Sequence, residues 1–254
     1  MSRKFTKISV LGLGYVGLPL SLQFARSGVS VLGLDLDPAK VDAINSGKSY
    51  LKHFSAESIA EQVDAGRFEA TTDPSRICEV EAILICVPTP LNDYREPDLS
   101  FVLDTAESLA PHLTKGVLVT LESTTYPGTT EDELRIVLEE GSGMKAGVDF
   151  HLTYSPERED PGREDASVKT IPKVVGGYTQ ACCDLGEALY SQALDQIYRV
   201  SSCRVAEATK LLENIFRSVN IALVNELKVV YEAMGIDVNE VISDVLPDVI
   251  LFQE

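Results

Sequence analysis

The feature that most constrains the fold is a glycine-rich stretch, VLGLGYVGLP at residues 10–19, which lies directly after an apolar run. Gly12, Gly14 and Gly17 have the spacing G-x-G-x-x-G, which predicts a strand, a tight turn and then a helix. In such a unit the first glycine permits the turn, the second leaves the backbone open to a ligand, and the third lets helix and strand pack closely. Free N–H groups at the helix N-terminus attract an anion, so the stretch is predicted to bind phosphate groups.

An acidic residue further along favours a dinucleotide as the ligand. The second predicted strand, SVLGLDL, reaches Asp35, and a carboxylate at this place accepts hydrogen bonds from ribose hydroxyls. Its charge repels a 2′-phosphate, so NAD is predicted rather than NADP. Asp37 is the alternative candidate for the ribose-binding carboxylate, but it precedes Pro38 and is expected to be a helix N-cap. Tyr15 and Val16, within the glycine-rich loop, are included in the predicted cofactor site.

The first two thirds of the chain alternate between short β-branched runs and amphipathic segments, as in a parallel sheet covered by helices. We therefore expect an α/β fold with a Rossmann-type, doubly wound, mostly parallel sheet, and we assign residues 1–200 to an NAD-binding domain. The predicted strands are residues 7–13, 30–36, 68–73, 82–88, 117–123, 150–156, 173–177 and 196–201. Two long loops, residues 88–100 and 155–172, follow predicted strands at the end where open α/β sheets bind ligands, so both are expected to be functional.

Residues 201–254 have a different pattern, with no glycine or proline between Ser201 and Gly235. We expect one long connecting helix here, followed by the start of a further domain. Its apolar residues spread beyond one stripe, which predicts either a subunit contact or a bridge to another domain, and we favour a homodimer formed through this helix. The residues concerned are Val205, Ala208, Leu211, Leu212, Ile215, Phe216, Val219, Ala222, Leu223, Leu227 and Val230.

Composition excludes several classes of protein. The formal net charge of −17 opposes nonspecific binding to nucleic acid. No uncharged apolar run is long enough to span a membrane, and no cleavage site follows the basic start, so neither a membrane protein nor a signal peptide is expected. Five cysteines without a C-x-x-C pair indicate neither a zinc site nor a disulfide framework, and no metal site is predicted. A cytoplasmic location is the simplest expectation.

The blocks GLGYVGLP, VPTP, DLS, ESTTYPGTT, YSPER..DPG and EATKLLENIFRSVNIALVNEL follow one another along the chain. In these blocks the sequence resembles the UDP-glucose/GDP-mannose dehydrogenase family, and most its UDP-N-acetylhexosamine 6-dehydrogenase branch. The resemblance implies oxidation of the C6 alcohol of a UDP-N-acetylhexosamine to the uronic acid, in two hydride transfers to NAD⁺. It also implies that Lys40 joins Asp35 near the adenosine ribose, and that Thr89 and Thr124 lie on the nicotinamide side.

Catalytic roles follow from the same resemblance. Lys210 and Asn214 lie four residues apart, so they share a helix face and could polarise a developing oxyanion, although a solvated helix face is the alternative. Glu157, in SPER, resembles a loop glutamate that assists proton transfer or positions the hydrolytic water; an exposed charge is its alternative. Thr124 could order a water molecule, or it could be a plain N-cap for a helix that begins near Pro127.

The resemblance fails at the family's nucleophile, a cysteine in a GGHC segment beyond the long helix, which these 254 residues do not contain. A substitute nucleophile is not expected. Cys86 is predicted to lie inside a buried strand, where a thiolate is disfavoured. Cys182, Cys183 and Cys203 are expected on helices.

Three interpretations remain open at this point. The chain could be a truncated product that binds NAD and dimerises, a part or altered form of a complete dehydrogenase, or a non-enzymatic NAD-responsive interaction module. The second is favoured because the proton-transfer and oxyanion residues are present. A β-hydroxyacid-type dehydrogenase also places Lys and Asn on a helix after the sheet, but it lacks the SPER..DPG loop.

Overall fold

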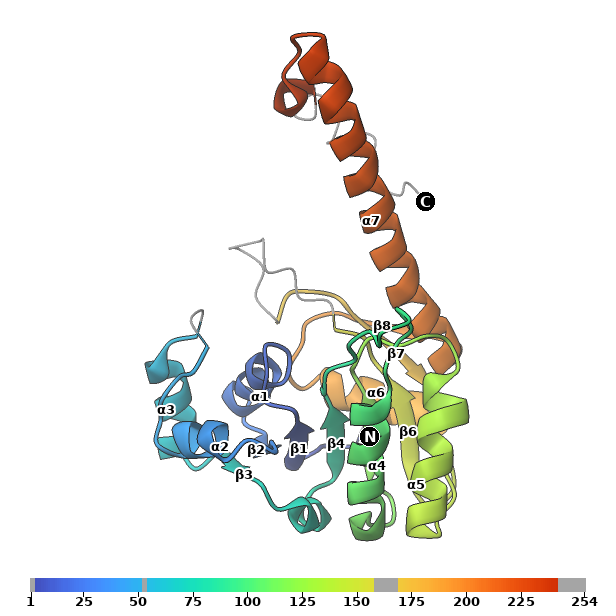
Figure 1. The fold of residues 1–254 in the computed structure, drawn as a ribbon. Coiled ribbons are helices and arrows are strands. Elements are labelled where there is room, and N and C mark those ends of the chain that lie inside the picture. Colours follow the sequence, from blue (N-terminus) through green and yellow to red (C-terminus); the bar gives the residue numbers. More distant parts are fainter. Residues whose placement is uncertain (1–2, 52–53, 158–168, 242–254) are drawn as a thin grey trace. The chain divides into compact units, whose positions relative to one another are not determined.

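The computed structural model describes residues 3–51, 54–157 and 169–241 of the 254-residue chain. It divides into two compact units, Met1–Thr209 and Lys210–Glu254. The first unit is built on one sheet of eight strands with helices on both faces (Figure 1). The strands are β1 (Lys7–Leu11), β2 (Ser30–Leu34), β3 (Phe68–Thr71), β4 (Ala82–Ile85), β5 (Leu118–Leu121), β6 (His151–Tyr154), β7 (Lys173–Gly177) and β8 (Ile197–Val200).

Seven α-helices accompany the sheet in the described part of the chain. They are α1 (Gly17–Arg26), α2 (Pro38–Asn45), α3 (Ala56–Asp64), α4 (Ser100–Leu109), α5 (Arg135–Ser142), α6 (Gln180–Tyr190) and α7 (Cys203–Ala233). Three short helical turns complete the set: η1 (Pro74–Glu79), η2 (Ala110–His112) and η3 (Thr129–Leu134). All eight strands overlap the segments that the sequence predicts, which confirms the expected α/β class.

The strand order is β3-β2-β1-β4-β5-β6-β7-β8, and every neighbouring pair is parallel except β6 and β7. The chain therefore winds outward from β1 in one direction and from β4 in the other. Between these two strands the winding reverses, and such a switch point is where open α/β sheets leave a crevice for a ligand. The sheet is doubly wound, as the sequence indicates.

Two apolar cores lie on opposite faces of the sheet. One packs α1, α2, α3 and α6 against it, and includes Phe24 and Tyr190, whose ring centroids are 6.2 Å apart. The other packs α4, α5 and the first turns of α7, and includes Val102, Leu138 and Cys203. Because successive side chains of a strand point to opposite faces, strands covered on both sides must be apolar throughout. This explains why β4 and β5 are entirely buried.

The long helix expected after Ser201 is present as α7, which begins at Cys203 and runs without interruption to Ala233. Only its first turns are buried, through Cys203, Ala206 and Glu207. Many large apolar side chains further along are exposed, among them Leu212 and Val219, at 58% and 60%. In the described ranges, none of the helices is both long and apolar enough to cross a membrane.

Candidate functional site

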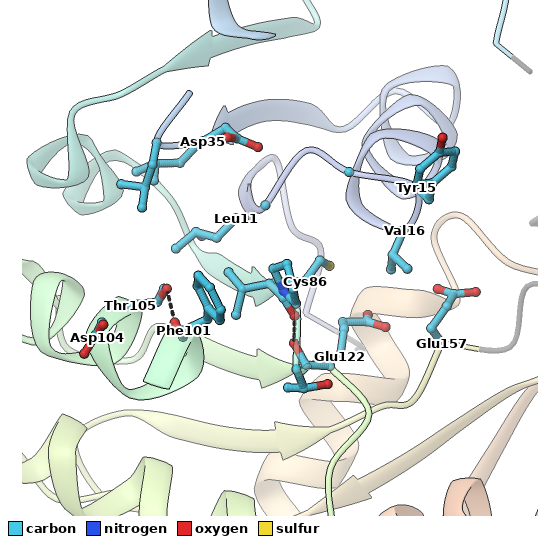
Figure 2. Close-up of a pocket in the computed structure, with 18 of the residues that line it drawn as sticks. Leu11, Tyr15, Val16, Asp35, Cys86, Phe101, Asp104, Thr105, Glu122 and Glu157 are labelled. Carbon is cyan, nitrogen blue, oxygen red and sulfur yellow. Dashed lines mark hydrogen bonds between the residues drawn. The ribbon is translucent and has the colours of Figure 1, made fainter. Parts of the chain in front are cut away.

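A cavity of about 660 Å³ opens at the carboxyl ends of β1, β2, β4, β5 and β6. This volume is within the range of small-molecule and cofactor sites. Figure 2 shows Asp35 and Asp104 toward one end of the cavity and Glu122 and Glu157 toward the other. The cavity therefore extends across the switch point of the sheet, over β1 and β4.

The three glycines of the first loop have distinct geometric roles. Gly12 has φ +85°, and a Cβ there would lie 2.7 Å from the carbonyl oxygen of Cys86. A Cβ on Gly17 would lie 2.0 Å from the carbonyl oxygen of Gly12, so the start of α1 can approach the turn only without a side chain. At Gly14 an added Cβ would meet no atom within 4 Å. Gly14 therefore leaves bare backbone on the cavity wall, which is what a pyrophosphate requires.

The first helix offers its N-terminus to the same space. α1 begins at Gly17, and its N-cap Val16 supplies no side-chain hydrogen bond to the first turn. Val16 and Tyr15 both line the cavity, and the Tyr15 side chain is 67% exposed. A helix start without a side-chain cap suits an anion, because backbone N–H groups and the positive end of the dipole remain available to it.

Asp35 stands directly after β2 and is 8% exposed. Its Oδ2 accepts hydrogen bonds from the Leu13 backbone N–H at 2.8 Å and from Lys40 Nζ at 2.9 Å, and its Oδ1 accepts one from the Asp37 backbone N–H at 3.0 Å. The carboxylate is thereby fixed at the edge of the cavity, with Lys40 also on the wall. Asp37 is the N-cap of α2 and accepts a hydrogen bond from the Ala39 backbone N–H, as the sequence predicts.

Tyr50 lies behind this carboxylate. Its hydroxyl donates to the carbonyl oxygen of Leu13, in the glycine-rich loop. Burial, together with the negative charges of Asp35 and Asp37, holds the pKa of Tyr50 well above its ordinary value, so the hydroxyl remains a donor. The loop and the acid are thus held together by hydrogen bonds before any ligand is present.

Thr89 and Thr124 both line the cavity, where they lie next to each other. The Thr89 hydroxyl donates to the carbonyl oxygen of Thr124 at 2.8 Å, which joins the segments after β4 and β5. Thr124 is not the N-cap of the following helix, so that alternative is wrong. η3 begins at Thr129, and its N-cap is Gly128 with φ +107°, a conformation that favours glycine.

The prediction for Cys86 is also wrong. β4 ends at Ile85, so Cys86 lies just beyond the strand, partly exposed, on the cavity wall. The predicted strand, residues 82–88, thus extends three residues beyond the observed end of β4, because an apolar run alone does not show where strand pairing stops; at Cys86 the backbone approaches Gly12 closely instead. Cys182, Cys183 and Cys203 are buried at the starts of α6 and α7, and burial holds the pKa of Cys203 far above its ordinary value.

Every predicted cofactor residue except Gly17 lines this cavity, and so does Glu157. Lys210 and Asn214 belong to the second unit, so their place in a site remains a prediction. His53, Arg158 and most of the loop from 155 to 172 lie outside the described residues. Lys169, near the end of that loop, pairs with Asp195 at 3.2 Å.

The sequence analysis missed a buried group beside the cavity. Glu122, directly after β5, accepts hydrogen bonds from Lys173 of β7 and from the hydroxyl of Tyr190 of α6. A charged residue at the carboxyl end of an apolar strand is the same signal that identified Asp35. In the segment VLVTLES this signal is present but was not used.

Comparison with known proteins identifies the family. Residues 6–194 match the NAD binding domain of the UDP-glucose/GDP-mannose dehydrogenase family, and residues 204–248 match its central domain. The chain belongs to this family. Residues 6–194 thus carry the family's NAD-binding domain, with the Rossmann-type fold expected from the sequence.

Individual relatives agree with this assignment. The chain is 37% identical over 241 residues to UDP-N-acetyl-D-glucosamine 6-dehydrogenase of Pseudomonas aeruginosa, covering 94% of the chain and 56% of that protein. It is 39% identical over 245 residues to UDP-N-acetyl-D-mannosamine dehydrogenase of Escherichia coli K12, covering 94% and 58%. The chain therefore spans little more than half the length of these curated relatives.

Solved structures give the same result. UDP-D-ManNAc dehydrogenase from Pyrococcus horikoshii superimposes with a TM-score of 0.90 at 34% identity, over 97% of this chain and 59% of that one. A ternary complex of GDP-mannose dehydrogenase from Pseudomonas aeruginosa gives a TM-score of 0.88 at 29% identity, over 96% and 57%. All four of these relatives are named as dehydrogenases of nucleotide sugars.

Proposed function

We propose that the cavity of the first unit binds NAD and that the chain supplies the cofactor half of a UDP-N-acetylhexosamine 6-dehydrogenase. The observation that carries the proposal is the open backbone at Gly14 beside the uncapped start of α1, with the Asp35 carboxylate on the same wall. The phosphates would rest on the loop and helix start, and the ribose hydroxyls would donate to Asp35. The bound cofactor supplies a hydride acceptor.

The chain's own residues have the following proposed roles. Glu157, after β6, accepts the proton of the C6 hydroxyl or of the hydrolytic water. The Thr124 hydroxyl orders the water on the nicotinamide side. Lys210 and Asn214, one turn apart on α7, donate to the oxyanion that develops at C6. The four-electron oxidation also needs the cysteine nucleophile of the family segment that these residues do not contain, so the complete reaction is proposed for a longer enzyme.

Two alternatives make different predictions. A catalytically incomplete, NAD-binding and dimerising module binds NAD⁺ but reduces none of it with any nucleotide sugar. A β-hydroxyacid-type dehydrogenase reduces NAD⁺ with a small hydroxy acid. We prefer a UDP-N-acetylhexosamine as substrate because two curated relatives named as UDP-N-acetylhexosamine dehydrogenases align over 94% of the chain at 37% and 39% identity, whereas the GDP-mannose dehydrogenase structure is 29% identical.

The test is calorimetric titration of the purified chain with NAD⁺, followed by absorbance of reduced nicotinamide. NAD⁺ alone is expected to give saturable binding. UDP-N-acetylglucosamine, UDP-N-acetylmannosamine and a hydroxy acid are then added in separate samples. Absence of heat from both NAD⁺ and NADH would contradict the cofactor site, and reduction by the hydroxy acid would contradict the substrate class.

We further propose that two copies of the chain associate through α7. This proposal is supported by the exposed apolar side chains of the helix, such as Leu212, Ile215 and Val219, at 58%, 50% and 60%. A single helix that exposes this much apolar surface gains stability by burying it against an equivalent helix. A two-fold contact needs only one such surface, since each copy presents the same residues.

A further inference from the structure

A buried ion pair lies against the cavity at the end opposite Asp35. The Glu122 side chain is fully buried, and its carboxylate accepts hydrogen bonds from Lys173 Nζ and from the Tyr190 hydroxyl. Lys173 is 5% exposed, and its ammonium lies 5.2 Å from the centre of the Tyr190 ring. Neither charge could remain here without the other, because removing an unpaired ion from water costs several kcal/mol.

The antiparallel pairing of β6 and β7 brings Lys173 to this place. Thr153 pairs with Gly177, so the start of β7 lies beside the residues that follow β6, including Glu157. Lys173 thus stands between two carboxylates, one after β5 and one after β6. Of the three charged groups, Glu122 and Glu157 line the cavity, whereas Lys173 is not part of its wall.

The charges of the cluster follow from these contacts. Burial acts to lower the pKa of Lys173, but Glu122 and Glu157 together raise it above its ordinary value, so the ammonium is charged. Burial raises the pKa of Glu122, and the charge of Lys173 opposes this rise. Two donors on one carboxylate, one of them cationic, favour the ionised form near neutral pH. The cluster then has two negative charges on the wall and one positive charge behind it.

This end of the cavity is where the nicotinamide would lie. Asp35 follows β2 and would hold the adenosine ribose, and the phosphates would lie over the loop after β1. A dinucleotide that continues across the switch point passes over β4 and reaches the segments after β5 and β6. Figure 2 shows Glu122 and Glu157 at this end.

We propose that Glu122 is a cofactor-binding residue that, together with Glu157, gives the cavity an electrostatic preference for the cationic nicotinamide of NAD⁺ over the neutral ring of NADH. The inference rests on the proposed NAD site. Lys173 and Tyr190 are positioning residues, since they hold Glu122 in place and ionised. The preference favours release of the reduced cofactor, which a dehydrogenase must exchange for NAD⁺ after each hydride transfer.

The experiment measures dissociation constants for NAD⁺ and NADH by calorimetry on the wild-type chain, on Glu122→Gln and on Asp104→Asn. The wild type is expected to bind NAD⁺ more tightly than NADH. Glu122→Gln should weaken NAD⁺ binding about tenfold more than NADH binding, the size of one charge acting over about 12 Å at an effective dielectric constant of about 20. Asp104→Asn removes an exposed carboxylate at the other end of the cavity, so it should change both constants by the same factor.

A purely structural role for Glu122 would weaken both nucleotides equally, and that result overturns the inference. A wild-type chain that binds NADH tenfold more tightly than NAD⁺ overturns it as well, and this measurement decides the matter even if Glu122→Gln does not fold. A wild-type chain that binds neither nucleotide contradicts the proposed function itself. The two failures are therefore distinct.

Discussion

At the scale of single residues, Asp35 is the side chain on which cofactor selection most depends. We predict that Asp35→Ala weakens NAD⁺ binding by about tenfold to a hundredfold, because hydrogen bonds to a charged group contribute about 1.5–3 kcal/mol. Asp37→Ala is the matched control: it removes the N-cap of α2, costs about 1 kcal/mol of stability, and leaves NAD⁺ affinity unchanged. Calorimetry and urea denaturation separate the two effects. Equal affinity of Asp35→Ala and wild type would refute the assignment.

His151, the first residue of β6, gives the protein a pH dependence of stability. Burial, and to a smaller extent the positive charge of Arg3, lower its pKa below the ordinary value of 6.5. The unfolded chain then binds a proton more readily than the folded one, so stability falls as pH decreases through 6.5 toward the folded-state pKa. We predict that urea midpoints of His151→Gln fall less than those of wild type between about pH 7.5 and pH 5. An equal fall of the urea midpoint in the variant and the wild type would contradict this prediction.

At the scale of elements, a buried carboxylate of α7 holds the start of this helix against the start of η3. Glu207 is fully buried, and it accepts hydrogen bonds from the backbone N–H of Gly128 at 2.6 Å and from the backbone N–H and hydroxyl of Thr130 at 2.9 and 2.7 Å. Burial raises the pKa of Glu207, while these donors oppose the rise. The N–H groups at the beginning of η3 are buried, and the Glu207 carboxylate of α7 serves as their hydrogen-bond acceptor.

Removing this acceptor leaves several buried donors without a partner. We predict that Glu207→Ala lowers the free energy of unfolding by about 3 kcal/mol or more, and that Glu207→Gln, which keeps one oxygen, costs less. Arg204→Ala, one turn earlier, breaks exposed ion pairs with Glu131 and Asp132 and should cost about 1 kcal/mol at most. Urea denaturation measures all three. A similar loss from Arg204→Ala and Glu207→Ala would show that burial of the carboxylate is unimportant.

The N-termini of the helices show which caps a sequence pattern can predict and which it cannot. The N-caps Asp37 and Asp73 each precede a proline, and the structure has both as caps with side-chain hydrogen bonds. The start of η3 was harder to place, because Gly128 caps it through its backbone conformation and not through a side chain. A polar residue near a proline therefore suggested Thr124 as a possible cap, whereas the N-cap of η3 is Gly128.

At the scale of the whole molecule, the test of the proposed association is hydrodynamic. We predict that the wild-type chain sediments as a dimer and that the double variant Leu212→Glu/Val219→Glu lowers the association constant by about a hundredfold or more, because two unpaired charges would have to be buried. Val148→Glu alters another apolar side chain, 81% exposed, in the first unit, and should leave the dimer intact. A monomeric wild type would contradict the proposal.

The strands, the glycine-rich turn and the capping role of Asp37 were predictable from sequence, because each depends on residues close together along the chain. Backbone freedom at Gly12, alternation in a buried strand and capping before a proline are local properties. The position of Cys86 on the cavity wall and the contacts of Glu122 with Lys173 and Tyr190 became evident only in the folded chain. Such contacts join residues far apart in sequence, through strand pairing and helix packing, and one sequence without its fold specifies no distance between them.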